Sequence, residues 1–534
     1  MNLLPNKQTC RTVFLFVLII QCFSAQAQQK YWVFFTNKAN TVFNPYTYFD
    51  AKAIERRIIN NVSLVDSTDF PINEFYYNTV SANVDSVSNS TRWFNGMCVY
   101  ANENQIQKIQ QFYFVRSIEA LPFQSMHLAS YNETSFNEKL SDDQKKLLVG
   151  QTTRLQADEF KKANIDGSGI RIAIFDAGFP NVDTNPAFEH IRKANKIIKT
   201  YDFVRKKDFV YGYAEHGSCV LSCIAGKAGD VNIGLATGAE FLLARTEMGK
   251  REPFSEEENW LAAVEWSDKN GVQIINSSLG YTGDRYFTTD MNGKKSLVSR
   301  AANLAARKGI LVVNAAGNEG SSAWKTIGTP ADADSVLTVG GIDMASDFHT
   351  DFSSYGPTAD NRLKPNVCAF GHVIAAGKNG LEKTQGTSFS SPLVAGFAAC
   401  ALQTNRNLKN MELYLEIEKS ADLYPYFDYA HGYGVPQASY FTEKNKTQST
   451  ATFDFVNENN YLTVKIQDAF FGKDTIDTKS NRLYYHIEND KGVITSYYII
   501  SVENQDVLKF SNYDYKKGQK IMVHYKNYTN SFTF

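Results

Sequence analysis

The sequence predicts an α/β protein whose main part is a mostly parallel sheet with helices on both faces. Five short apolar runs support this fold, and segments with a helical pattern separate them. Strands that consist of continuous apolar residues are typical of sheets buried on both faces, and such sheets are mostly parallel. The five predicted strands are residues 170–175, 241–244, 272–275, 310–313 and 336–339.

A smaller α+β unit is predicted before this main part. Residues 31–35 form the first strand-like run, and residues 51–59 form a charged helical stretch. A second strand at 94–100, a helix at 103–111 and a third strand at 115–119 follow in that order. The polar stretch from about 129 to 146 has few apolar residues and is interpreted as a linker, where proteolysis tends to concentrate.

The composition changes again after residue 442. Residues 450–534 are rich in Tyr, Phe, Val and Ile, and alternation of polar and apolar residues is clear at 461–466 and 521–525. Alternating strands separated by turn-forming residues predict a small antiparallel, β-sandwich-like domain.

The N-terminus has the features of a secretory signal peptide. Lys7 and Arg11 precede an apolar run at 13–20, and Ala25-Gln26-Ala27 fits a cleavage site. We therefore expect a secreted or cell-surface protein without a membrane span, since no later segment has transmembrane length. Cys22 leaves a lipoprotein as the alternative. The expected domains are 1–27, signal peptide; 28–140, α+β unit and linker; 150–442, parallel-sheet domain; 450–534, β domain.

Charge and cysteine content exclude some classes of function. The 55 basic and 56 acidic residues give a formal charge of −1, which offers no electrostatic basis for binding nucleic acid. Five cysteines remain after the signal peptide, without CxxC spacing, so neither a disulfide scaffold nor a zinc cluster is indicated. Buried, unpaired cysteines are the favoured interpretation, with a Cys368–Cys400 disulfide as the alternative.

Three polar residues stand where such a sheet places its chemistry. Asp176 follows the strand at 170–175, and the carboxyl ends of parallel strands are where functional groups gather. His216 and Ser388 each stand at the start of a helical run of small residues. Each residue alone has an ordinary interpretation, because Asp often begins a turn and Ser often caps a helix. Asn318, just after the strand at 310–313, adds an amide donor suited to an oxyanion.

Together these motifs resemble the subtilisin-like serine protease (subtilase) family over about residues 150–442. The order Asp, His, Ser is that of subtilisin. Phe175-Asp-Ala-Gly178, His216-Gly-Ser218 and Gly386-Thr-Ser388 resemble the family's three catalytic motifs, although Ala177 replaces a hydroxyl residue. The resemblance implies a Ser388 nucleophile, a His216 base oriented by Asp176, and Asn318 in the oxyanion hole. It further implies substrate-binding segments made of Ser277, Ser278, Leu279, Gly280, Ala315, Ala316 and Gly317.

The resemblance extends to the N-terminal unit, which is similar to the inhibitor-like propeptide of subtilases. It implies a secreted endopeptidase of protein or peptide substrates, made as a precursor inhibited by residues 28–140. A permanently attached N-terminal domain is the alternative to a removed propeptide, and a catalytically silent peptide-binding protein is the alternative to an enzyme. No cofactor is expected; structural calcium would fit the family, but no acidic cluster locates a site. The acidic run Glu256-Glu257-Glu258 is interpreted as a solvated helix start, or as a feature that selects basic substrates.

Overall fold

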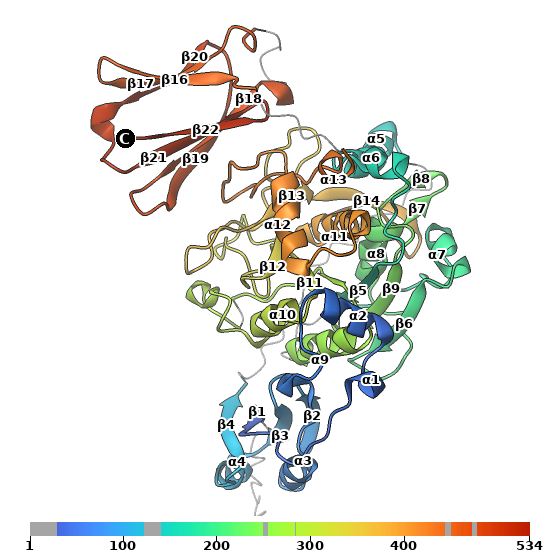
Figure 1. Ribbon diagram of the computed structural model, residues 1–534. Helices are drawn as coiled ribbons and strands as arrows, with labels where there is room; N and C mark the ends of the chain where they lie inside the picture. Colours follow the sequence, from blue (N-terminus) through green and yellow to red (C-terminus); the bar gives the residue numbers. More distant parts are fainter. Residues whose placement is uncertain (1–28, 122–139, 249–254, 284, 444–449, 473–477) are drawn as a thin grey trace, which may run out of the picture.

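The computed structural model describes residues 29–121, 140–248, 255–283, 285–443, 450–472 and 478–534. Three parts of the chain follow one another in space as they do in sequence (Figure 1). A small four-stranded sheet lies at one end of the molecule, the large parallel sheet with its helices occupies the centre, and the C-terminal strands lie at the other end.

The N-terminal part is an antiparallel sheet in the order β2-β3-β1-β4, which confirms the predicted α+β unit. Its core contains Val33, Phe35, Met97 and Val99, all fully buried. The strands are β1 (Gln29–Phe35), β2 (Ser86–Thr91), β3 (Gly96–Ala101) and β4 (Val115–Ala120). The helices are α1 (Pro45–Tyr48), α2 (Ala51–Ile59), a 3-10 turn (Ser67–Asp69), α3 (Glu74–Ser81) and α4 (Glu103–Gln110).

The central sheet has seven strands in the order β13-β12-β11-β10-β5-β9-β6, and all neighbouring pairs are parallel. All five strands expected from apolar runs belong to it. The strands are β5 (Arg171–Asp176), β6 (Ile197–Asp202), β9 (Glu240–Arg245), β10 (Ile274–Ser277), β11 (Leu311–Ala315), β12 (Val336–Ile342) and β13 (Val367–Phe370).

Helices cover both faces of this sheet, as predicted. Alternate side chains of β5 show the division: Ile172 and Ile174 pack in one core, and Ala173 and Phe175 pack in the other. The first face is covered by α5 (Asp142–Thr153), α6 (Ala157–Lys162), α8 (His216–Ala225), α11 (Thr387–Thr404) and α12 (Asn410–Ser420). The second face is covered by α9 (Ser255–Lys269) and α10 (Leu297–Arg307).

Part of the stretch predicted to be a linker is helical instead. Ser141 caps α5, and its side chain and that of Gln144 bond reciprocally to the backbone at the first turn. Leu147 and Leu148 of this helix are buried in the central core. The linker interpretation is therefore wrong for residues 141–146, and its part at 129–139 lies outside the described residues.

Short elements connect the central strands. They are two 3-10 turns (Pro186–Phe188 and Thr288–Asp290), α7 (Glu189–Lys193), β7 (Lys227–Ala228), β8 (Val231–Asn232), β14 (His372–Gly377), β15 (Gly380–Gln385) and α13 (Ser439–Thr442). The hairpin of β14 and β15 is antiparallel and leads directly into α11.

The C-terminal part consists of two antiparallel sheets, β16-β17-β20 and β19-β18-β21-β22, around one core, which confirms the predicted β domain. The strands are β16 (Phe453–Glu458), β17 (Tyr461–Ile466), β18 (Arg482–Glu488), β19 (Ile494–Ser501), β20 (Asp506–Ser511), β21 (Lys520–Tyr525) and β22 (Tyr528–Thr533), with 3-10 turns at Lys479–Asn481 and Asn512–Asp514. His486 bonds to the carbonyl oxygen of Phe427 at 2.5 Å and so joins this part to the central one.

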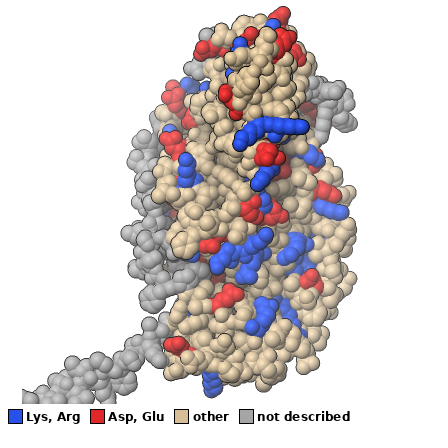
Figure 2. All heavy atoms as spheres, turned by 90° about the vertical axis from the view of Figure 1, so that its left-hand side faces the viewer, with Lys and Arg blue, Asp and Glu red and all other residues tan. Residues whose placement is uncertain are grey.

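The distribution of charged side chains and the unpaired state of the cysteines agree with the expectations drawn from the composition. On the face shown in Figure 2, Lys and Arg side chains gather near the middle and lower part, with Asp and Glu interspersed among them. All five cysteines in the described part of the chain are buried and unpaired, so Cys368 and Cys400 form no disulfide. Within the described ranges, no helix is both long and apolar enough to cross a membrane.

Candidate active site

Asp176 and His216 form a hydrogen-bonded pair at the carboxyl edge of the central sheet. Asp176 is the last residue of β5 and is fully buried, while His216 is the first residue of α8. The Nδ1 atom of His216 lies 2.9 Å from Oδ1 and 3.0 Å from Oδ2 of Asp176. Gly217 permits this approach, because a Cβ atom there would lie 2.3 Å from the carbonyl oxygen of Gly178 and 2.9 Å from Cβ of Asp176.

The carboxylate sets the electrostatics of the histidine. Burial by itself lowers the pKa of His216, but the charge and the hydrogen bond of Asp176 outweigh it and raise the pKa above its ordinary value of 6.5. A second hydrogen bond, from the backbone N–H of Ala177 to Oδ1 of Asp176 at 2.8 Å, holds the carboxylate in place. The backbone supplies this bond, so Ala177 keeps it without the hydroxyl that is usual at this position.

Ser388 is half-buried and lies at the start of the helix α11. Gly386 precedes the helix with φ of +137°, a conformation that residues with a side chain rarely adopt. The Oγ atom of Ser388 donates to the carbonyl oxygen of Ser278 at 3.2 Å, and the Oγ atom of Ser278 donates to the carbonyl oxygen of Ser388 at 2.7 Å. These bonds place Ser388 beside the end of β10, which is the neighbour of the strand that carries Asp176.

Asn318 is held at the mouth of the site by Thr387. Its Oδ1 atom accepts hydrogen bonds from the backbone N–H of Thr387 at 2.9 Å and from its Oγ1 at 3.0 Å. Because Oδ1 is engaged in this way, the amide is oriented with its Nδ2 donor away from Thr387. The asparagine is exposed to solvent.

The two predicted substrate-binding segments lie side by side. Residues 277–280 begin at the last residue of β10, and residues 315–317 begin at the last residue of β11. These strands pair in parallel, with Ser277 opposite Asn314. Ser277, however, is fully buried, and its hydroxyl accepts a hydrogen bond from the indole N–H of Trp260 at 3.0 Å. Ala316 is buried as well, while Gly280 is exposed and Gly317 is half-buried. If these segments bind a substrate, most of their side chains are too buried to contact it, and their backbone would do so.

Comparison with known proteins gives the family. Residues 167–434, half of the chain, match the sequence model of the subtilase family, Peptidase S8. The chain belongs to the subtilase family. Residues 30–139 match a second model, the Peptidase S8 propeptide domain of Bacteroidota. This agrees with the resemblance seen in the motifs and in the N-terminal unit.

Individual relatives match the central part of this subtilase. A thermophilic serine proteinase from Bacillus sp. (strain AK1) is 32% identical over 261 residues, which is 48% of this chain and 57% of the relative. Subtilisin DY from Bacillus licheniformis is 28% identical over 46% of this chain and 82% of its own length. The structure of the epidermin leader peptide processing serine protease from Staphylococcus aureus covers 79% of this chain and all of its own, with a TM-score of 0.55 and 14% identity, a likeness of fold alone.

Several buried hydroxyl groups lie around the site, and each has a partner. Ser222 Oγ donates to the carbonyl oxygen of Cys219 at 2.7 Å and accepts from the N–H of Ala376 at 2.9 Å. Ser390 donates to the carbonyl oxygen of Phe370 at 3.0 Å, and Ser391 donates to Oδ1 of Asn276 at 2.9 Å. None of these three hydroxyls is therefore left unpaired in the core.

Two further side chains belong to the same region. The ring of Phe389 lies 5.3 Å from that of His216, centroid to centroid, and packs against it. The Sγ atom of Cys219 lies 3.1 Å from Oε1 of Glu382. Burial raises the pKa of this thiol well above its ordinary value, and the carboxylate raises it further. Both effects disfavour the reactive thiolate form of Cys219.

Neither interpretation of Glu256-Glu257-Glu258 fits the structure. All three side chains are buried. Glu256 and Glu257 pair with Arg285 at 3.6 and 2.9 Å, and Glu258 pairs with Lys30 of the N-terminal part at 2.5 Å. The run is neither solvated nor available to a basic substrate.

Clusters of acidic, cysteine or histidine side chains are common metal sites. Among the described residues, no group of three or more such side chains could hold an ion.

The contact of Thr387 with Asn318 is the feature of the candidate site that the sequence did not predict. Thr387 was visible only as part of the Gly-Thr-Ser motif, and the motif gives no reason to connect it with Asn318. The two residues are 69 positions apart, so their contact depends on the packing of α11 against the end of β11.

Proposed function

We propose that this subtilase is a serine endopeptidase in which Ser388 attacks the scissile carbonyl and forms an acyl-enzyme. The observation that carries the proposal is the buried Asp176–His216 pair at the edge of the sheet where Ser388 begins its helix. In the proposed reaction His216 takes the proton of Ser388 Oγ, and Asp176 fixes the imidazole tautomer and stabilises the imidazolium. The match covers only 57% of the length of the thermophilic serine proteinase. The activity of the whole chain is therefore part of the proposal.

The proposed oxyanion hole combines the side-chain amide of Asn318 with the backbone N–H of Ser388. Support comes from the two bonds that hold Asn318 by its oxygen, and from the position of Ser388 at a helix N-terminus, where the helix dipole favours negative charge. Donors fixed before the reaction begins stabilise developing charge without reorganisation.

Labelling with a fluorophosphonate probe tests this function. The purified processed protein should become covalently labelled, and the Ser388→Ala variant should not. Unlabelled protein must also cleave a mixed peptide pool, and this activity must be lost on labelling. A folded protein that takes no label and cleaves no peptide would instead be a silent peptide-binding protein.

We further propose that residues 1–27 direct secretion and that residues 28–140 form a propeptide that inhibits the precursor and is then removed by the enzyme itself. The match of 30–139 to a propeptide model supports the second part. The Ser388→Ala precursor should remain uncut in a host without other proteases; normal processing of that variant would exclude self-cleavage.

The preferred residue before the scissile bond is proposed to be neutral or apolar. The segments 277–280 and 315–317 contain no charged side chain, and the nearby glutamates are paired with Arg285 and Lys30. Profiling the cleavage of a peptide pool tests the preference, and a strict requirement for Arg or Lys would refute it.

A further inference from the structure

Helix α2 lies apart from the rest of the N-terminal part and against the central one. The four-stranded sheet packs on the outer surface of α9, whereas α2 lies at the edge of the central sheet where strands begin (Figure 1). Asp50, just before α2, bonds through its N–H to the carbonyl oxygen of Lys269 at 2.9 Å and pairs with Arg171 at 3.2 Å. This edge is opposite to the one that carries Asp176 and Ser388.

Two arginines of α2 are buried in the central part. Arg56 bonds to the carboxylate of Asp268 and to the carbonyl oxygens of Val272 and Lys308, which follow the helices α9 and α10. Arg57 reaches the second oxygen of Asp268 at 2.6 Å. In the described chain, both cationic partners of Asp268 thus come from α2.

A third buried cation completes the cluster from the other side. Lys308 of the central part bonds to Oδ1 of Asp69 at 2.8 Å and to Oγ1 of Thr68 at 2.7 Å. Asp69 also accepts from Arg57 at 2.7 Å. The two arginines, the two aspartates and the lysine are each at most 3% exposed. Removing one member of this cluster while the two parts stay joined would leave its partners buried without an opposite charge, which is costly.

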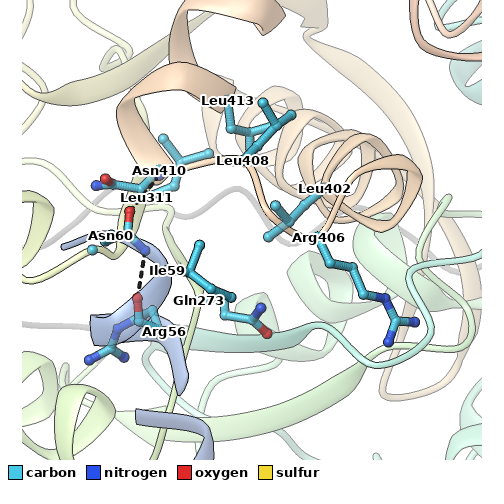
Figure 3. Close-up of a pocket in the computed structure, with 11 residues that line it drawn as sticks. Arg56, Ile59, Asn60, Gln273, Leu311, Leu402, Arg406, Leu408, Asn410 and Leu413 are labelled. Atoms are coloured by element: carbon cyan, nitrogen blue, oxygen red, sulfur yellow. Dashed lines mark hydrogen bonds between the residues drawn. The ribbon is translucent and has the colours of Figure 1, made fainter. Parts of the chain in front are cut away.

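The surface under α2 is shaped to receive it. Gly271 and Gly309 follow α9 and α10 with φ of +74° and +88°. A Cβ atom on Gly271 would lie 2.6 Å from Cβ of Lys52, and one on Gly309 would lie 2.8 Å from the amide of Asn60. Figure 3 shows Asn60 between α2 and Asn410: its Oδ1 accepts from the N–H of Asn410 at 2.8 Å, at the first turn of α12.

We propose that the surface of Asp268, Gly271, Lys308 and Gly309 is a docking site for α2 that keeps residues 29–121 on the enzyme after the connecting chain is cut. The proposal rests on the proposed processing of the precursor. The N-terminal part then has two attachments, one on α9 and one at the far edge of the sheet. Linked attachments hold far longer than either alone, because release requires both to open together.

The test uses the full chain with Ser388→Ala and a recognition sequence for a site-specific protease placed within residues 122–139. Cutting at this sequence does not need the chain's own activity, so the result is independent of whether Ser388 is catalytic. Gel filtration at successive times after cutting measures how fast residues 29–121 separate from the rest.

We expect the cut parent to elute as one complex. Asp268→Asn should raise the dissociation rate at least about tenfold, because losing one partner of a buried charge pair acts mainly on dissociation. Glu189→Gln, a matched change at an exposed ion pair of the central part, should leave the rate unchanged. Lys52→Ala changes a residue at the partly exposed margin of the site and should raise the dissociation rate several-fold. If Asp268→Asn does not fold, the dissociation rate of Lys52→Ala tests the proposal. Immediate separation of the cut parent, or dissociation of both variants at the parent's rate, would overturn the proposal.

Discussion

The hydrogen bond from Thr387 to Asn318 gives a sharp prediction about catalysis. Thr387→Val removes the Oγ1 donor, 3.0 Å from Oδ1 of Asn318, and keeps the backbone donor at 2.9 Å. One of two bonds to Oδ1 of Asn318 is lost, together with the contacts of this hydroxyl with the carbonyl oxygen of Gly317 at 3.1 Å and the N–H of Gly317 at 3.2 Å. An intramolecular hydrogen bond contributes about 0.5–1.5 kcal/mol, and 1.4 kcal/mol, near the upper end, corresponds to about a tenfold change in rate.

We therefore expect kcat to fall about tenfold in Thr387→Val, with KM nearly unchanged. Asn318→Ala should cost about 10²–10³ in kcat, the loss known for removing such a donor in subtilisin. Adding Thr387→Val to Asn318→Ala should cost little more, because both changes act through one amide. Steady-state kinetics on a peptide chosen from the cleavage profile measures all three variants.

Ser390→Ala is the matched control for this series. It removes a buried hydroxyl of the same helix that bonds to Phe370 at 3.0 Å and not to the amide of Asn318. Ser390→Ala should lower the thermal stability and leave kcat unchanged. A loss for Thr387→Val as large as that for Asn318→Ala, full additivity in the double variant, or a rise in KM alone would refute the reasoning.

Three further predictions concern charge and burial. Because His216 must be neutral to act as a base, kcat/KM should fall as the pH drops through its pKa, and Asp176 should place this midpoint above 6.5; a pH profile with a midpoint below 6.5 would contradict this. Iodoacetamide at neutral pH should leave native protein active, since the Cys219 thiol is buried with a raised pKa, but should alkylate it after unfolding; rapid inactivation of folded protein would be the opposite result. Arg285→Ala should destabilise the fold by about 3–5 kcal/mol in denaturant unfolding, because two buried glutamates lose their guanidinium, whereas Lys193→Ala at an exposed pair should cost under about 1 kcal/mol; equal losses would show that the buried cluster contributes nothing special.

The sequence predicted those parts of the fold whose pattern is strong. Five apolar runs predicted five strands of the central sheet, but β6 and β13 escaped notice. The strand β6 is at the edge of the sheet and carries Lys199 and Thr200, so it lacks a continuous apolar run. The strand β13 has only four residues, Val367–Phe370. The capping pair Ser141 and Gln144 was a readable sign of α5 that charge-rich neighbours obscured.

Contacts between residues far apart in the sequence limited how much of the candidate site could be predicted. The motifs predicted that Asp176, His216 and Ser388 lie together, because a parallel sheet collects its strand ends at one edge. Of these contacts, the structure gives the hydrogen bonds between Asp176 and His216. The burial of Glu258 could not be predicted in this way. Its partner Lys30 is on another part of the chain, and only the docking of the two parts removes both charges from water.

The buried hydroxyls near the site also determine which residues can be exchanged. Ser222 accepts a backbone N–H from Ala376, and Ser391 donates to Asn276, so each serine is matched to a particular neighbour. Replacing Ser222 by glycine or Ser391 by alanine would leave that neighbour's polar group unpaired, at a cost of about 1–3 kcal/mol. Chimaeras between this subtilase and a relative should therefore exchange the helix and its facing strand together. Residue-by-residue replacement would pass through intermediates less stable than either parent.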